Sequence, residues 1–166
     1  GHRVRKNSMV KCRGRGGKDV YRKQLLDGLS CIHKYGKVAH HDIKSDNVLY
    51  DKLTEYDGCP NQLYIADFGL AEPLGRTTIF FPARGLQTSQ HRVTACIEGG
   101  EDALSIHVDN NEKVVGYIVS RRIDYCGLIF MANTDFGWRI PIPDYPSFNC
   151  GKMGPGRKVE YTSAMR

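Results

Sequence analysis

The sequence predicts an α+β domain that is mostly helical, with short β-strands around a polar loop. The first observation is an apolar stripe at helical spacing between Asp19 and Tyr35, formed by Tyr21, Leu25, Leu29 and Ile32. The second is a pair of short runs of strand-forming residues, Val48–Tyr50 and Leu63–Ala66. The third is the polar segment between helix and strands, which carries the chemistry.

The remaining elements follow from local signals. Gly36 is the expected stop of the first helix. The segment Asp51–Gln62 contains turn signals and is expected to be an exposed loop. Further along, apolar residues alternate with polar ones from Leu104 to Val108, and a β-rich run extends from Val114 to Val119, which together predict a hairpin.

The polar segment has the pattern H-x-D-x-K-x-x-N, and a D-F-G follows the second strand run. The residues that carry the pattern are His40, Asp42, Lys44, Asn47, Asp67, Phe68 and Gly69. Carboxylate and amide oxygens suit Mg²⁺, and a further carboxylate can orient an attacking hydroxyl, as phosphoryl transfer requires. The pattern resembles the catalytic loop and metal-binding segment of eukaryotic-type protein kinases, and Lys44 is typical of the serine/threonine type.

The resemblance implies a role for each matched residue. It makes Asp42 the catalytic base, and it places Lys44 on the transferred phosphate. It makes Asn47 and Asp67 the ligands of Mg²⁺ in a complex with ATP, and it places Leu49 beneath the adenine. It further implies that His40 and Phe68 stack in an internal hydrophobic spine, with Gly69 completing the metal-binding motif. The expected cofactors are ATP and Mg²⁺, and the expected partner is a protein substrate.

A second stretch, Arg121–Met131, resembles the start of the buried central helix of a kinase C-lobe. By this resemblance Asp124 would hydrogen-bond the backbone of the catalytic loop, while a helix N-cap is the alternative interpretation. The run from Ile123 to Gly127 also weakly echoes mitotic-checkpoint kinases of the budding-uninhibited type. A second D-F-G at residues 135–137 is interpreted as coincidence, with Gly137 ending a helix.

The sequence departs from the kinase pattern in two ways that bear on regulation and substrate docking. His41 replaces the arginine that grips an activation-loop phosphate in many kinases, so gating through this residue should be weak at neutral pH. The closing A-P-E is replaced by Ala95–Glu98 at best, and the predicted hairpin is unusual at this place. Five hydroxyl residues between the motifs are candidate phosphate acceptors: Thr77, Thr78, Thr88, Ser89 and Thr94.

The expected organisation is a basic flexible arm over residues 1–18, a partial kinase C-lobe over 19–140, and a Pro/Gly-rich polar tail over 141–166 that is poorly ordered. Eighteen residues cannot hold the glycine-rich loop and strand lysine of an N-lobe. We therefore expect a C-lobe fragment without its N-lobe, inactive alone and binding ATP at millimolar concentration at best.

Composition limits the compartment and the partners. The net charge is +6, and residues 1–24 hold nine Lys or Arg against one Asp. We expect this arm to be solvated rather than bound to nucleic acid, although its charge leaves that partner open. Six cysteines without a C-x-x-C pair indicate reduced thiols rather than a zinc site or disulfide scaffold. No signal peptide or membrane-length run is present, which predicts a cytoplasmic or nuclear protein without a membrane partner.

Two other functions remain open. The first alternative is a pseudokinase or scaffold that keeps the fold and lacks turnover. The second is a small-molecule phosphotransferase of the aminoglycoside or choline kinase type, which shares H-x-D-x-x-x-x-N. Lys44 and the complete D-F-G argue against the second alternative, because that group usually lacks both.

Overall fold

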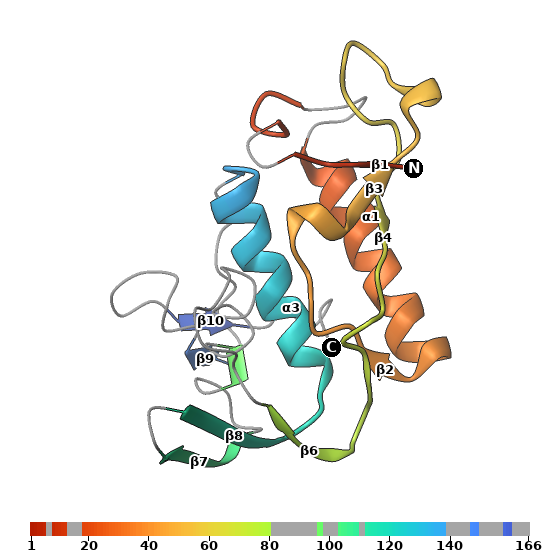
Figure 1. Ribbon diagram of the computed structural model, residues 1–166. Coiled ribbons are helices and arrows are strands. Elements are labelled where there is room, and N and C mark those ends of the chain that lie inside the picture. Colours follow the sequence, from red (N-terminus) through yellow and green to blue (C-terminus); the bar gives the residue numbers. More distant parts are fainter. Residues whose placement is uncertain are drawn as a thin grey trace.

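The computed structural model describes residues 1–5, 8–12, 18–80, 96–97, 103–109, 112–138, 147–149 and 158–160. Two α-helices, α1 (Lys18–Cys31) and α3 (Arg121–Phe130), form its helical framework. In Figure 1 the segment that follows β2 rises between these helices toward β3. The polar motif loop is part of this segment, so it runs through the middle of the domain.

Helix α1 forms where the apolar stripe predicts it. Tyr21, Leu25 and Leu29 are all fully buried, as one helical face requires. A π-helical turn, Ile32–Gly36, continues the helix as far as the predicted stop. The chain leaves through Lys37, which has the left-handed backbone angle (φ 53°), so the residue after Gly36 makes the turn.

Two small antiparallel sheets frame the motif loop. β1 (His2–Arg3), β3 (Val48–Tyr50) and β4 (Tyr64–Ile65) form one sheet in the order β1-β3-β4. β2 (Val38–Ala39) pairs with β5 (Glu72–Pro73). The two predicted strand runs are confirmed as β3 and β4. The loop therefore begins at the end of β2 and ends where β3 starts.

A three-stranded sheet stands at the lower end of Figure 1. It consists of β6 (Thr77–Phe80), β7 (Ala103–Asp109) and β8 (Glu112–Ile118), in the order β6-β8-β7. The predicted hairpin is confirmed as β7 and β8. β6 adds a third strand, which alternation alone did not reveal. With ten strands and two α-helices in the described residues, this part of the chain is mixed α+β rather than mostly helical.

Helix α3 is buried from Ile123 to Phe130, and a π-helical turn, Met131–Asp135, extends it. Ser120 occupies the N-cap position. The turn ends at Asp135, and Gly137, two residues on, has a left-handed φ of 65°, which confirms the predicted helix stop at the second D-F-G. Trp138 then donates its indole N–H to the Met9 carbonyl over 3.3 Å, which joins the end of this segment to the N-terminal region.

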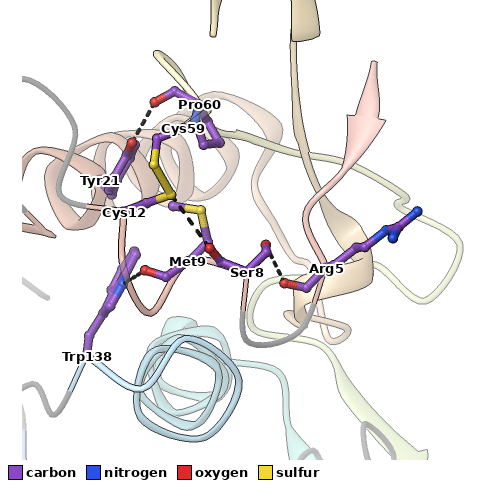
Figure 2. Close-up of a disulfide and its surroundings, with 8 residues drawn as sticks. All are labelled: Arg5, Ser8, Met9, Cys12, Tyr21, Cys59, Pro60 and Trp138. Carbon is purple, nitrogen blue, oxygen red and sulfur yellow. Dashed lines mark hydrogen bonds between the residues drawn. A yellow bond between two sulfur atoms is a disulfide. The ribbon is translucent and has the colours of Figure 1, made fainter. Parts of the chain in front are cut away.

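The expectation of a solvated N-terminal arm does not hold for residues 1–5 and 8–12. Val4 and Met9 are buried, and β1 pairs with β3. Figure 2 shows how a disulfide between Cys12 and Cys59, with Cα atoms 5.6 Å apart, ties this segment to the loop after β3. Apolar side chains between the basic residues explain the difference, because they pack on the domain while the charges stay in solvent.

The cysteines also differ from expectation. Cys12 bonds Cys59, and Cys96 bonds Cys126 on α3. Cys31 is a free, exposed thiol among the described residues. The paired cysteines are 47 and 30 residues apart in the sequence, so neither pair could be recognised from spacing. A disulfide forms only where the fold brings the two Cα atoms close enough. The interpretation of reduced thiols was wrong for these four residues.

Little of the expected tail lies within the described residues. Two of its stretches, β9 (Ser147–Asn149) and β10 (Lys158–Glu160), pair antiparallel with each other. Candidate phosphate acceptors Thr88, Ser89 and Thr94 lie outside the described residues. Across the described part of the chain, neither α-helix has the length and apolar character needed to cross a membrane.

Candidate functional site

Asp124 fixes the start of the motif loop from helix α3. Its carboxylate is fully buried and accepts the backbone N–H of His40 over 2.7 Å and that of His41 over 2.9 Å. Ser120, not Asp124, occupies the N-cap position of the helix, so the alternative interpretation of Asp124 as an N-cap is wrong. The expected contact between Asp124 and the loop backbone is present.

His33, on the π-helical turn after α1, is a third partner of this carboxylate. Its Nε2 lies 2.7 Å from Asp124 Oδ2, and both side chains are buried. Since a carboxylate only accepts, the hydrogen of this contact belongs to Nε2. Three donors thus satisfy a buried charge that would otherwise be costly.

His40 joins the motif loop to the D-F-G segment. Its Nδ1 accepts the N–H of Asp42 over 3.1 Å, so Nε2 carries the hydrogen and donates it to the Ala66 carbonyl over 2.7 Å. The imidazole stacks edge-on against Phe68 with ring centroids 5.1 Å apart. The expected stack of these two rings is therefore present, although Phe68 is 49% exposed.

Asp42, Lys44 and Asn47 converge within the loop. The amide Nδ2 of Asn47 donates to Asp42 Oδ2 over 2.9 Å and to the Asp42 carbonyl over 2.8 Å. Lys44 Nζ lies 3.7 Å from the same Asp42 Oδ2. A 3₁₀ turn, Ser45–Asn47, brings Asn47 back toward Asp42. The structure thus gathers three of the four predicted polar residues around one carboxylate oxygen.

Asp67 lies two residues after the end of β4 and has a left-handed backbone (φ 62°). Its Oδ1 accepts the Gly69 N–H over 3.1 Å, a turn that aspartate favours. The backbone N–H of Ala66 donates to the Asn47 carbonyl over 2.8 Å, so the D-F-G segment is attached beside Asn47. Leu49 is half-buried in β3. It pairs with Arg3 of β1, and its side chain lies against Gly1 in the N-terminal segment.

His41, the residue in the place of the family's arginine, is buried in a closed environment. Nδ1 donates to the Leu70 carbonyl over 3.2 Å, and the ring packs edge-on against Tyr117 of β8. Burial lowers the pKa of His41 below 6.5, although the Asp124 carboxylate, the Leu70 carbonyl and the Glu72 carboxylate oppose the shift. The imidazole is therefore neutral at physiological pH and ill suited to gripping a phosphate.

The site offers oxygen donors in small number. The described residues contain no group of three or more His, Cys, Asp or Glu side chains placed to hold a metal ion. Mg²⁺ in nucleotide sites usually takes one or two protein oxygens and completes its shell with phosphates and water. Both hydrogen bonds of the Asn47 amide are donated by its nitrogen. The amide oxygen of Asn47 and the carboxylate of Asp67 are thus the chemically fitting pair.

Two cavities lie beside this centre rather than in it. A cavity of about 680 Å³ is lined by the N-terminal segment, β3 and the loop after it, and includes Asp46 of the motif loop. A second, of about 380 Å³, lies between α1 and β4 and includes Phe68. Asp42, Asn47 and Asp67 line neither of these two cavities. Asn47 is buried, and the side chain of Asp42 is only 12% exposed.

Sequence reasoning missed two polar residues of the site. His33 lies four positions after Leu29, so it continues the apolar stripe of the helix. A polar residue at such a position was the signal in the sequence that His33 is buried. Asp135 is buried, and its Oδ2 accepts the Ser45 N–H over 3.4 Å. Its D-F-G context had been interpreted as coincidence, and only the fold brings it to the loop.

Comparisons with known proteins agree with the motif. The profile of the family described as "Protein kinase domain" matches residues 9–94 of the 166. A protein named serine/threonine-protein kinase 1, from Lymantria dispar multicapsid nuclear polyhedrosis virus, is 37% identical over 57 residues. That match covers 34% of this chain and 18% of the viral protein, so the chain spans only a small part of that relative. No solved structure matches.

Proposed function

This chain belongs to the protein kinase domain family, and on that premise we propose that it supplies the catalytic centre of a serine/threonine protein kinase. The reaction would transfer the γ-phosphate of ATP to a serine or threonine of a protein. Lys44 in the motif loop and the name of the viral relative support the serine/threonine type. The residues proposed to act are Asp42, Lys44, Asn47 and Asp67.

The observation that carries the proposal is the convergence on Asp42 Oδ2. Asn47 Nδ2 donates to this oxygen over 2.9 Å, and Lys44 Nζ lies 3.7 Å from it. Such contacts hold a carboxylate in one orientation, as a base needs when it accepts the proton of an attacking hydroxyl. A solvated surface loop without a function does not require a carboxylate, an amide and an ammonium group in mutual contact.

Each side chain has a separate task in this proposal. Asp42 orients the substrate hydroxyl and accepts its proton. Lys44 offers a point charge to the transferred phosphate. Asn47 and Asp67 would hold Mg²⁺, which neutralises phosphate charge when it is bound with the nucleotide. Leu49, on β3, is proposed to contact the adenine.

A scaffold role is the second candidate, and exposed apolar side chains beside the D-F-G favour it. Tyr64, Phe68 and Leu70 are each about half exposed. Together they offer an apolar surface next to the cavity between α1 and β4. In this reading the family fold is kept for binding a partner, and nucleotide binding without turnover is the distinguishing behaviour.

The proposal is tested by Mg·ATP titration of the full-length protein, followed by thermal shift, with a phosphorylation assay on a generic serine/threonine substrate. Asp67→Asn removes a metal-binding charge, so the Mg²⁺-dependent shift should fall together with the rate. Asn47→Ala should have the same effect in a milder form, partly rescued by more Mg²⁺. Asp42→Asn should keep nucleotide binding and lose the rate.

Asp57→Asn is the matched control. Asp57 is exposed in the loop after β3 and has a left-handed φ of 53°, which asparagine adopts readily. It should bind Mg·ATP and turn over like the wild type. A wild-type protein that binds Mg·ATP without any turnover would replace the kinase proposal with the scaffold candidate.

A further inference from the structure

Helix α3 and the π-helical turn that extends it, Met131–Asp135, together contact the motif loop near both ends of the loop. At the start of the loop, Asp124 accepts the N–H groups of His40 and His41. Near the other end, Asp135 Oδ2 accepts the N–H of Ser45 over 3.4 Å. Asp124 lies on α3 and Asp135 on the π-helical turn that extends it, and both carboxylates accept N–H groups of the loop.

Between these two contacts the helix approaches the loop closely. A Cβ added to Gly127 would lie 3.2 Å from the Cβ of Ile43, closer than side chains normally pack. In Figure 1 the loop segment runs alongside α3 over this stretch. The loop backbone is therefore held by a carboxylate at each end and by close packing in the middle.

We propose that Asp135 is a second positioning residue of the catalytic loop. It holds the amide of Ser45, which opens the 3₁₀ turn Ser45–Asn47, and this turn places the Asn47 amide on the Asp42 carboxylate. The catalytic consequence rests on the proposed function. The effect on the loop itself rests only on the contact between Asp135 and Ser45.

The physical need for Asp135 follows from the turn. A first-position N–H has no partner within its own helical turn, so a buried one requires an acceptor from elsewhere. Ser45 and Asp135 are both buried. At 3.4 Å this bond is longer than those of Asp124, so its loss should loosen the loop locally and leave the domain folded.

Removing the donor provides an independent test of the same bond. Ser45→Pro deletes the N–H, and proline suits the first position of a helical turn. Lys44, which precedes it, is extended (φ −152°, ψ 164°), the conformation that a residue before proline prefers. The conformation of Lys44 is therefore compatible with a proline at position 45.

The experiment is a double-mutant cycle in the full-length protein with Asp135→Ala, Ser45→Pro and the double variant. The first readout is amide hydrogen exchange at residues 40–47, compared with residues 21–29 of α1. We expect each single variant to speed loop exchange by about tenfold or more, and the double variant to add little, because coupled sites are not additive. Exchange in α1 should not change.

The second readout is kinetic. Asp135→Ala should lower kcat and also raise the KM for Mg·ATP, because a loosened Ser45–Asn47 turn displaces both the Asp42 carboxylate and the Asn47 oxygen proposed to hold Mg²⁺. Asp135→Asn keeps an oxygen acceptor and should restore most of the rate and the protection. Thr134→Ala, an exposed change on the same turn, should behave like the wild type.

The outcomes separate the two ideas. Unchanged loop exchange in Asp135→Ala, or full additivity in the cycle, overturns the positioning role even if the protein is an active kinase. A wild-type protein without turnover removes the proposed function, while loop exchange still decides whether Asp135 holds Ser45. If Asp135→Ala fails to fold, Ser45→Pro alone tests the bond from the donor side, and unchanged loop exchange in that variant overturns the positioning role.

Discussion

His40 donates its backbone N–H to Asp124 Oδ2 over 2.7 Å, although 84 residues separate them in the sequence. The bond joins the first residue of the motif loop to a helix that follows the three-stranded sheet. Because both groups are buried, the bond has no competing water. The geometry of the loop therefore depends on the folding of α3 against it.

Asp124→Ala should destabilise the protein strongly. It leaves the N–H groups of His40 and His41 buried without their acceptor, and each such group costs about 1–3 kcal/mol. Urea unfolding should show a loss of about 2–5 kcal/mol. Asp19→Asn, a change at an exposed ion pair, should stay within about 0.5 kcal/mol. Equal stability of the two variants would contradict the anchoring role.

Two helical glycines should respond differently to alanine. Gly127→Ala places a Cβ 3.2 Å from Ile43 Cβ, so the loop must shift, at a cost of about 1–3 kcal/mol. Gly28→Ala in α1 places a Cβ no closer than 3.5 Å to the Ile65 side chain, an ordinary contact. The gain in helix propensity, about 1 kcal/mol, should then dominate at Gly28. Thermal unfolding of both variants checks the contrast, and a stabilised Gly127→Ala would refute the close approach.

Acidification should weaken the fold through His41. Because burial lowers its pKa in the folded state, the unfolded chain binds a proton there first as the pH falls. The contribution of neutral His41 to the free energy of unfolding is complete above pH 6.5. As the pH falls toward the lower pKa of the folded state, this contribution declines by at most about 1.4 kcal/mol per pH unit.

The control for this pH effect is His41→Asn, which does not titrate and suits the left-handed φ of 69°. Unfolding free energies between about pH 7.5 and 5.5 should fall more steeply for the wild type than for the variant. Parallel curves would show that His41 is not responsible for the acid sensitivity.

The two disulfides should be detectable and stabilising. Replacing Cys12 and Cys59 by serine should lower the unfolding free energy by about 2–4 kcal/mol, because the bond restricts the unfolded chain. Cys31→Ser, at a free exposed thiol, should be neutral. Mass spectrometry after alkylation without reductant should leave Cys12, Cys59, Cys96 and Cys126 unlabelled. Labelling of all four would disprove both bonds.

Local signals in the sequence predicted the framework well. The stripe through Tyr21, Leu25 and Leu29 predicted α1, and alternation predicted the β7–β8 hairpin. These elements follow from side-chain periodicity, which each segment carries by itself. The spacing of Asp42, Lys44 and Asn47 in one loop is likewise visible in the chain, and the structure brings these side chains together, while their roles stay predictions.

Features that depend on distant segments could not be predicted. β6 pairs with β8 across about forty residues, and the cysteine pairs form only after folding. Val4 and Met9 looked like part of a charged arm, because their partners lie elsewhere in the chain. Asp135 is the clearest case, since its partner Ser45 lies 90 residues away in the sequence and only the fold brings the two together.

The measurement that tests the central claim most directly is γ-phosphate transfer from Mg·ATP to a protein serine or threonine by the full-length protein. Wild type and Asp57→Asn should both transfer phosphate. Asp42→Asn should be slower by about 10²–10⁴-fold, because it keeps the shape of the loop and removes the proton acceptor. Turnover that survives Asp42→Asn unchanged would contradict the assignment of this loop as the catalytic centre.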